Sequence, residues 1–344
     1  MGITYEQSGV NINAGNLLIN RIREPLQSTS RPEVLHSIGG FASLAALPTK
    51  FKDPLIVCST DGVGTKLKLA IKYDFHESIG QDLVAMCVND VLVYGAEPFL
   101  FLDYFATGKL DVDVAERVIR GIADACRLTG CSLAGGETAE LPGMYAHSDY
   151  DVAGFCIGLV ERSDYEQRPP IAKEDILLGL SSNGPHSNGF SLIRKLLEEV
   201  SGQPPNEIWQ ELTQPTKLYV NDVLSVAGRA TGMAHVTGGG LVENPPRMLT
   251  SGLAVELDLR SWQRPACFEW LNRIGQLEPI EMLRTFNCGI GFLLAVREEH
   301  VDDVKSQLTE RGETVSVVGR IVDAGTQATR NKLIVDKDLN ISLG

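Results

Sequence analysis

The chain has 344 residues, and its 31 Lys and Arg side chains against 44 Asp and Glu side chains give a formal net charge of −13. This excess of negative charge, with no run of three basic residues, argues against binding to nucleic acid or to anionic lipid. A hydrophobic fraction of 43% with 22% charged residues is typical of a globular chain. At about 150 residues per domain, the length favours two domains.

Neither a membrane span nor a secretion signal is visible. No apolar stretch approaches the roughly 20 residues that cross a bilayer, and residues 1–12 are too polar for a signal peptide. We therefore expect a cytoplasmic protein that does not enter membranes. The seven cysteines are scattered and contain no Cys-x-x-Cys pair, so we expect most of them to be reduced thiols in the core.

The first half of the chain predicts alternating strands and helices. β-rich or alternating segments predict strands at residues 54–60, 99–105 and 150–160. Apolar residues recur at three- and four-residue steps over residues 81–94 and 112–129, which indicates two helices. Two strand-helix rounds therefore precede a polar, proline-bearing stretch at residues 162–174.

The second half begins a new α/β set after that polar stretch. The predicted elements are strands at residues 176–180, near Phe292 and near Val315, and helices at residues 190–200 and 299–311. We therefore predict a two-domain α/β (α+β) fold with domains at residues 1–165 and 170–344.

The first candidate site is the loop Asp61–Lys66, which follows the strand at residues 54–60. Gly62 and Gly64 let backbone N–H groups approach phosphate oxygens, Lys66 can neutralise them, and Asp61 offers an oxygen ligand for Mg²⁺. The spacing is neither that of a Walker A loop nor that of a dinucleotide-binding loop. A strand-terminating turn with a solvated lysine is the alternative.

Two further acidic segments lie downstream. Asn89 and Asp90 stand in an otherwise apolar stretch, where an unpaired carboxylate would cost several kcal/mol, so a cation or a ligand is a reasonable partner. The alternative is an aspartate that reaches solvent. The segment Gly135–Glu140 is expected to form a third acidic loop, with Glu140 as a surface acid. Asp61, Asp90 and Glu137 could together supply the protein's share of the oxygen ligands of Mg²⁺.

Two glycine-rich segments of the second half suit an anion. Residues 182–189 join a strand to a helix, and the free N–H groups at a helix start favour a phosphate. His186 in this loop could orient or protonate a substrate, although a lone histidine in a turn is usually structural. Residues 237–240, Thr-Gly-Gly-Gly, are either a second backbone-rich site or a plain turn.

In these and other motifs the chain resembles phosphoribosylformylglycinamidine cyclo-ligase, the aminoimidazole ribonucleotide synthetase of purine biosynthesis. The likeness covers nearly the whole chain, and so many long matches in order make a chance resemblance improbable. The motifs are DGVGTK from Asp61, MCVND from Met86, GAEP from Gly95, LDYFATGKLD from Leu102, GGETAELPGMY from Gly135, DVAGFC from Asp151, GPHSNG from Gly184, TGGG from Thr237 and RTFNCGIG from Arg284.

The resemblance implies an ATP-dependent ligase that closes the ring of formylglycinamidine ribonucleotide to give aminoimidazole ribonucleotide, ADP and phosphate, with Mg²⁺ accompanying ATP. It gives Lys66 and His186 catalytic roles, and it makes Asp61, Asp90 and Glu137 metal ligands. The ATP-binding residues would be Asp61, Gly62, Gly64, Thr65, Lys66, Asn89, Asp90, Gly136, Glu137 and Thr138. The substrate-binding residues would be Gly184, His186, Ser187, Asn188 and Gly189.

The resemblance also implies a homodimer in which the mixed sheets of two N-terminal domains form a shared barrel. The N-terminal domain would bind ATP and dimerise, and a C-terminal α/β sandwich would complete the substrate site. Two positions depart from the family: Arg23 stands where many members have a lysine linked to the nucleotide site, and Ala42 replaces a common glycine in the loop Gly39–Ala42.

Related enzymes of the same architecture fit less well. Selenophosphate synthetase usually has a reactive cysteine near its N-terminus, whereas the first cysteine here is Cys58; the hydrogenase-maturation dehydratase ends in a working cysteine, whereas this chain ends at Gly344. The formylglycinamide ribonucleotide amidotransferase is far longer. Thiamine monophosphate kinase is the nearest alternative enzyme, and a nucleotide-binding protein without turnover is the alternative of another class.

Overall fold

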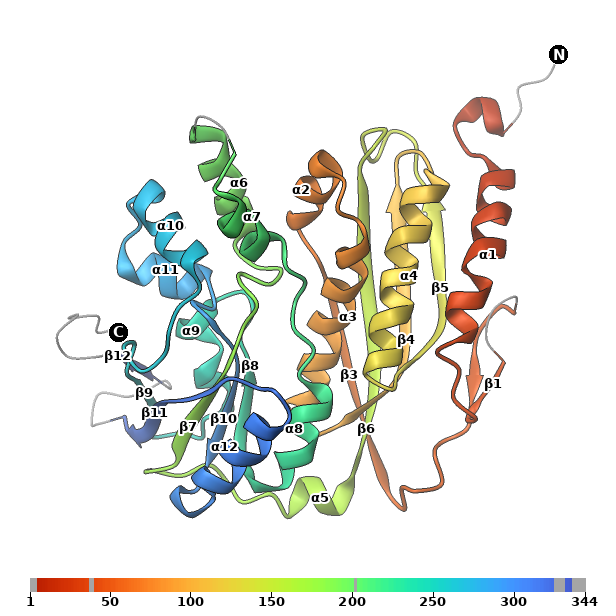
Figure 1. Ribbon diagram of the computed structural model, residues 1–344. Coiled ribbons are helices and arrows are strands. Elements are labelled where there is room, and N and C mark those ends of the chain that lie inside the picture. Colours follow the sequence, from red (N-terminus) through yellow and green to blue (C-terminus); the bar gives the residue numbers. More distant parts are fainter. Residues whose placement is uncertain (1–4, 37–39, 201–202, 325–331, 336–344) are drawn as a thin grey trace. The chain divides into compact units, whose positions relative to one another are not determined.

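The computed structural model describes residues 5–36, 40–200, 203–324 and 332–335 (Figure 1). Its chain divides into two compact units. Unit 1 comprises Met1–Val91 and Ala96–Glu161, and unit 2 comprises Leu92–Gly95 and Arg162–Gly344. The expected loop Gly39–Ala42 falls partly, and the C-terminal residue Gly344 wholly, outside the described residues.

Unit 1 is built on a four-stranded mixed sheet in the order β3-β6-β4-β5. Only the pair β4 and β5 is parallel. The strands predicted at residues 54–60, 99–105 and 150–160 are confirmed, but the segment after Gly135 is a strand and not the expected loop. The strands are β3 (Pro54–Gly62), β4 (Glu97–Thr107), β5 (Ser132–Glu140) and β6 (Tyr150–Glu161).

Two helices, α3 (Glu77–Leu92) and α4 (Val112–Leu128), cover one face of this sheet, and both were predicted (Figure 1). They cross so closely that a Cβ on Gly80 would lie 2.2 Å from the backbone nitrogen of Ile122. The remaining elements are α1 (Ile12–Gln27) and α2 (Lys66–Tyr73), the 3₁₀ turn η1 (Glu6–Ser8), and the short strands β1 (Val34–His36) and β2 (Leu44–Ala45).

The other face of the unit 1 sheet stays open. Along β6 the even-numbered side of the strand is buried, whereas Phe155 on the opposite side is 43% exposed. Phe155 pairs with Thr60 and Leu102, so the face it marks continues over β3 and β4. Ile56 and Tyr104 on that face are also exposed. An apolar face open to water is a common sign of a surface that another chain covers.

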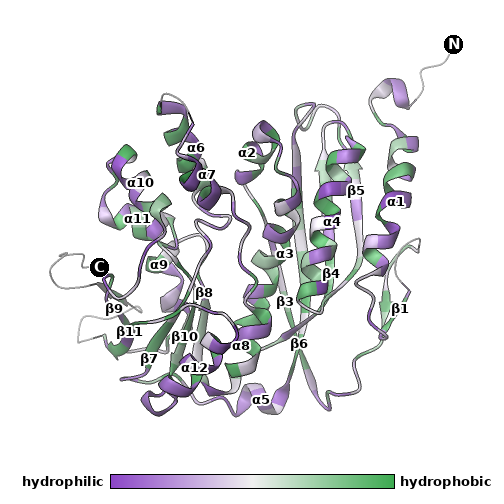
Figure 2. Ribbon diagram, viewed as in Figure 1, coloured by the Kyte–Doolittle hydropathy of each residue, from purple (hydrophilic) through white to green (hydrophobic). Residues whose placement is uncertain are grey.

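Unit 2 contains a six-stranded sheet in the order β12-β9-β11-β7-β10-β8, antiparallel except for the pair β12 and β9. Strand β10 is buried along its whole length, and Figure 2 shows strongly hydrophobic colouring there and on β7. The strands are β7 (Ile176–Ser181), β8 (Ala230–His235), β9 (Leu253–Leu257), β10 (Ile290–Val296), β11 (Val315–Asp323) and β12 (Lys332–Val335).

The helices of unit 2 include the two that the sequence predicted, α6 (Phe190–Glu199) and α12 (Val301–Glu310). Polar stretches that gave no helical signal also contain helices. These and the other elements are α5 (Arg162–Glu166), α7 (Asn206–Thr213), α8 (Val220–Val226), α9 (Gly240–Glu243), α10 (Ala266–Gly275), α11 (Pro279–Thr285), η2 (Ala227–Arg229), η3 (Pro245–Met248) and η4 (Glu298–His300). The predicted two-domain α/β architecture is confirmed.

Two expectations about the chain's environment can be compared with the fold. All seven cysteines are free thiols, and six of them are buried, with Cys58 the exposed one. Within the described ranges, no helix is both long and apolar enough to cross a membrane.

Candidate active site

The acidic part of the candidate site begins where β3 ends. Asp61 is half-buried, and its Oδ1 accepts a hydrogen bond of 2.8 Å from the N–H of Gly62. The chain then turns through Gly64, whose φ of +71° is a conformation that favours glycine, and the exposed Thr65 is the N-cap of α2. The loop is therefore shorter than predicted, because β3 extends to Gly62 and Lys66 already belongs to the helix.

Lys66 does not project into solvent. Its side chain and that of Asp82 on α3 are both 0% exposed, and Lys66 Nζ lies 2.7 Å from Asp82 Oδ2. Burial lowers the pKa of Lys66, and the charge of Asp82 opposes that shift. In this structure Lys66 therefore ties the start of α2 to α3 through a buried ion pair.

Asp61 on β3 and Asp90 on α3 are both close enough to Cys87 for their charges to act on its thiol. Cys87 on this helix has its Sγ 4.0 Å from the carbonyl oxygen of Asp61. Burial raises the pKa of the Cys87 thiol well above its usual value, and the charges of Cys156, Asp61 and Asp90 raise it further. Both carboxylates therefore raise the pKa of the same buried thiol. Asn89, next to Asp90 in the chain, is fully buried.

Glu137 lies elsewhere on the sheet. Gly62 pairs with Ala153, Ala153 with Tyr104, and Tyr104 with Glu137. Three strand spacings of about 4.8 Å separate the outer members of this row, so Glu137 is roughly 14 Å from β3. It also shares the open face with Tyr104, whereas Asp61 belongs to the helix-covered face. Within a single chain, Glu137 therefore does not share a site with Asp61 and Asp90.

One residue away from the row that contains Tyr104 and Glu137, β4 carries an acidic residue that sequence reasoning missed. Asp103 lies between Gly154 and Gly136 in the register, and its side chain is buried. Burial raises the pKa of Asp103 to about 7. A Cβ on Gly136 would lie 2.1 Å from Asp103 Oδ1, so a glycine is needed beside this carboxyl group. The signal was a lone carboxylate in an apolar run from Phe99 to Phe105.

The described residues contain no preformed metal cluster of three Asp, Glu, His or Cys side chains. Mg²⁺ is commonly bound by one or two carboxylates together with water and substrate phosphates. The pair Asp61 and Asp90 fits such a share of ligands. Gly136 and Thr138 belong to β5 and lie with Glu137 on the far strand of the sheet.

In unit 2 the loop 184–189 is rigidly packed. Gly184 has a φ of +141°, and its carbonyl oxygen accepts hydrogen bonds from Ser182 Oγ (2.9 Å) and Asn287 Nδ2 (2.8 Å). The hydroxyl of Ser187 lies 2.9 Å from that of Thr216. Gly189 caps α6 and has no room for a side chain, because a Cβ would lie 2.2 Å from the ring of Phe286.

His186 is buried inside this loop, with an exposed fraction of 1%. Its Nε2 accepts a hydrogen bond of 3.3 Å from the N–H of Asn183, which places the neutral ring's proton on Nδ1. The ring lies 6.3 Å from that of Tyr219, a fully buried residue whose hydroxyl donates to the Ser181 carbonyl. This geometry makes His186 a residue that shapes the loop. Tyr219 gave no sequence signal of its own.

The side-chain amide of Asn188 can still donate hydrogen bonds. Its Nδ2 is buried and has no hydrogen-bond partner among the described residues. A Cβ on Gly238 would lie 3.5 Å from Asn188 Oδ1, so the turn 237–240 adjoins the loop. Gly240 in turn packs on the Leu283 carbonyl oxygen, where a Cβ would come within 2.2 Å. The turn 237–240 therefore lies between the loop that carries Asn188 and the end of α11.

The fold and these segments define a two-domain α/β protein with an acidic strand end in one unit and a glycine-rich loop cluster in the other. The family model of the AIR synthase related protein N-terminal domain matches residues 45–160. The family model of the C-terminal domain of the same proteins matches residues 172–330. The two matches together span most of the chain, which therefore belongs to the AIR synthase related proteins.

Solved structures with the same fold include a kinase and a hydrogenase maturation protein. Thiamine-monophosphate kinase from Stenotrophomonas maltophilia K279a aligns with a TM-score of 0.71 at 18% identity over 93% of this chain and 95% of its own. The hydrogenase maturation protein HypE in complex with ATP aligns at 0.66, with 18% identity over 92% and 91%. AaThiL complexed with AMPPCP and TMP aligns at 0.60, with 17% identity over 98% and 96%. At these identities the likeness establishes the fold.

Proposed function

We propose that this protein is an ATP-dependent ligase that cyclises formylglycinamidine ribonucleotide to 5-aminoimidazole ribonucleotide, with release of ADP and phosphate. Membership of the AIR synthase related proteins supports the ATP-using class. The observation that favours the cyclo-ligase within that class is in unit 2. There the motifs that resemble the cyclo-ligase, GPHSNG and TFNCGIG, form one assembly through the hydrogen bonds of Asn287 and Ser182 with Gly184.

The proposed reaction needs two kinds of chemistry. The formyl oxygen of the substrate takes the γ-phosphoryl group of ATP, and ADP leaves. The ribose-bearing amidine nitrogen then attacks the activated carbon, and phosphate is expelled with the former formyl oxygen. Positioning and charge neutralisation are the usual sources of rate in such transfers.

We assign the phosphoryl half to unit 1. Asp61 and Asp90 would hold Mg²⁺, which neutralises charge on the phosphates when it is bound. Gly62, Gly64 and Thr65 would present backbone N–H groups and a hydroxyl to the phosphates. Lys66 would act through its ion pair with Asp82, by fixing the start of α2 behind this turn. Asn89, Gly136, Glu137 and Thr138 stay predicted members of the ATP site.

We assign the ribonucleotide half to unit 2. The amide of Asn188 is the group best suited to donate a hydrogen bond to the substrate, because its Nδ2 is buried and unpaired among the described residues. Gly184, Ser187 and Gly189 would shape the loop that surrounds it. His186 would act as a positioning residue, since its ring is buried against Tyr219.

A second copy of the chain completes the proposed enzyme. Both outer strands of the unit 1 sheet, β3 and β5, are edges, and edge strands readily pair with another chain. Pairing β3 of one copy with β5 of the other would close eight strands into a barrel and cover the apolar face around Phe155. Such a homodimer is the arrangement that the family resemblance implies.

The test incubates purified protein with formylglycinamidine ribonucleotide and Mg-ATP while aminoimidazole ribonucleotide and ADP are followed together. Equal appearance of both products is the expected result. ADP without the imidazole product would contradict the proposed reaction.

Thiamine monophosphate kinase is the second candidate, because that enzyme has the same fold with a TM-score of 0.71. A parallel incubation with thiamine monophosphate and Mg-ATP separates the two. We expect no thiamine diphosphate. Its formation, in place of the imidazole product, would assign the kinase reaction to this chain.

A further inference from the structure

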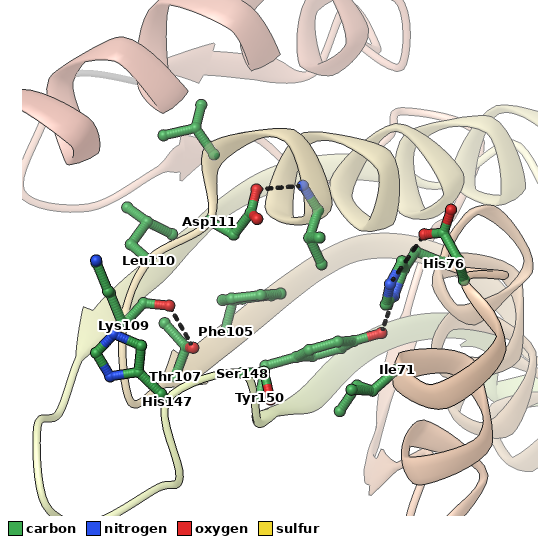
Figure 3. Close-up of a pocket in the computed structure, with 13 residues that line it drawn as sticks. Ile71, His76, Phe105, Thr107, Lys109, Leu110, Asp111, His147, Ser148 and Tyr150 are labelled. Carbon is green, nitrogen blue, oxygen red and sulfur yellow. Dashed lines mark hydrogen bonds and ion pairs between the residues drawn. The ribbon is translucent and has the colours of Figure 1, made fainter.

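A cavity of about 680 Å³ opens in unit 1, beside the ends of β4 and β6 (Figure 3). Small-molecule sites typically have volumes of about 300–1,000 Å³, so a ligand as large as a nucleotide fits this space. The cavity is lined by the last turn of α2, the end of β4, the first turn of α4 and the residues that lead into β6. None of its lining residues belongs to the acidic site at Asp61 or to the loops of unit 2.

Two stacked aromatic rings border one end of the cavity. The rings of Phe105 and Tyr150 stack with centroids 5.1 Å apart and an interplanar angle of 11°. The Tyr150 hydroxyl lies 2.8 Å from His76 Nδ1, which fixes the outer ring, and both side chains are buried. Both rings are almost inaccessible, with Phe105 2% and Tyr150 5% exposed, so a ligand meets apolar surface at side chains such as the partly exposed Ile71 and Leu110. An apolar end of this kind suits an aromatic ring.

The opposite end of the cavity is polar and cationic. Figure 3 shows Lys109 and His147 close together at that end, away from His76, and both side chains are exposed. Within the part of the chain that the structure describes, the ammonium group of Lys109 makes no ion pair. Ser148, next to His147 in the chain, adds a hydroxyl to the lining of the cavity. Such a group of donors suits an anionic substituent of the ligand.

The two carboxylates of the lining are already engaged. Asp111 Oδ1 caps α4 by accepting hydrogen bonds from the N–H groups of Asp113 (3.0 Å) and Val114 (3.2 Å). Asp74 Oδ1 lies 2.6 Å from Arg117 Nη1. Because their charge is offset by the helix start and by a guanidinium group, the carboxylates do not cancel the cationic rim.

The cavity is separate from the acidic site. Asp61 is level with Gly154, four residues along β6 from Tyr150, which corresponds to about 13 Å. On the helix-covered face between them lies Val152, which is 2% exposed. A ligand in the cavity therefore does not reach Asp61 along this face of the sheet.

We propose that this cavity is a second binding site, specific for a nucleoside monophosphate, with the base at the apolar end beside Ile71 and Leu110 and the phosphate at Lys109 and His147. The site is independent of the reaction proposed above. It requires both a planar ring and an anion, since each end of the cavity recognises only one of them.

Calorimetry with the full chain and AMP tests this site without an activity assay. Adenosine and inorganic phosphate, each lacking one half of the ligand, should both bind at least about tenfold more weakly than AMP. The variant Lys109→Ala should weaken AMP about five- to tenfold and leave adenosine unchanged. Lys305→Ala, at an exposed lysine of α12, is the matched control and should change neither affinity.

The position of the AMP site on the chain is tested by photolabelling with 8-azido-AMP and mapping of the modified peptide. Labelling within residues 105–114 or 147–150 is expected. Labelling at residues 61–65 would overturn the proposal, as would absence of AMP binding at millimolar concentration. Equal affinity for AMP and adenosine would overturn it as well, because the cationic end would then have no role.

Discussion

Strands β6 of unit 1 and β10 of unit 2 both lie in the interior of their sheets, yet only β10 is buried along its whole length. Side chains on β6 alternate between a face covered by helices and a face open to water. Strand β10 of unit 2 is therefore covered on both faces, whereas unit 1 leaves an apolar face open. The comparison teaches that the unit with the acidic residues is also the unit whose sheet the proposed second copy would cover.

Ion pairs offer a second comparison, because Lys66 and Asp82 of unit 1 are both fully buried, whereas the carboxylates that unit 2 buries, Asp175 and Glu313, pair with partly exposed cations. The largest expected effect comes from Lys66→Met, which leaves the fully buried Asp82 without its cation. We expect a loss of about 3–5 kcal/mol in the free energy of unfolding, measured with urea. In unit 2, Arg320 and Glu256 form a solvent-screened pair at the surface, so Arg320→Met should leave the urea midpoint nearly unchanged. Equal losses would remove the distinction.

Asp103 should give unit 1 a characteristic pH dependence. Its folded pKa of about 7 lies above the ordinary value of 3.8, so between those values the folded chain keeps a proton that the unfolded chain has released. Stability should therefore fall as pH rises through this window, by up to about 1.4 kcal/mol per pH unit and on the order of 4 kcal/mol in all.

The variant Asp103→Asn isolates this effect. Urea unfolding of both proteins from pH 4 to pH 8 should show the slope in the wild type and a flatter dependence in the variant. The same slope in both would assign the pH dependence to other groups.

Asp61 at the end of β3 and Asp90 on α3 carry the proposed chemistry, so substitutions there should affect turnover. Asp61→Asn and Asp90→Asn should each lower formation of aminoimidazole ribonucleotide at least about a hundredfold, because each removes a charge that would hold Mg²⁺ on the phosphates. The exposed Asp124 on α4 is the control, and Asp124→Asn should leave turnover unchanged. Wild-type rates in both site variants would exclude these residues from the reaction.

The close crossing of α3 and α4 predicts the smallest of these effects. A methyl group at Gly80 would collide with backbone atoms of α4, so Gly80→Ala should destabilise the protein by about 2 kcal/mol. A Cβ at Gly15 on α1 would meet no atom within 4 Å, so Gly15→Ala should be neutral or stabilise by up to about 1 kcal/mol. Thermal unfolding of both variants compares them directly.

Periodicity predicted much of the fold but little of the site geometry. Helices α3 and α4 were found because their apolar stripes are regular, β4 because residues 99–105 have the pattern of a buried strand, and β6 because residues 150–160 alternate. The segment after Gly135 was expected to be a loop because of its glycines. In the structure these glycines make room instead, as Gly136 does for Asp103. Helices α5 and α7 were missed because polar residues dominate their sequences.

The sequence did not predict which side chains contact one another. Lys66 looked like a phosphate ligand in an exposed turn, but its pairing with Asp82 depends on how α2 meets α3. Which face of the sheet Glu137 occupies depends on the register of β4 and β5, and a shift of one residue would reverse it. Residue type alone suggested that Asp61 and Asp90 share a site, and the packing of α3 against β3 explains why both carboxylates act on Cys87.

The open face of unit 1 provides the most direct test of this account. Analytical ultracentrifugation of the wild type should show a dimer of twice 37.4 kDa at micromolar concentration, and Phe155→Asp should dissociate it. Val317→Asp, at a partly exposed position of unit 2, should leave the dimer intact. A stable wild-type monomer, or a Phe155→Asp protein that still forms the dimer, would contradict the claim that a second copy covers this face.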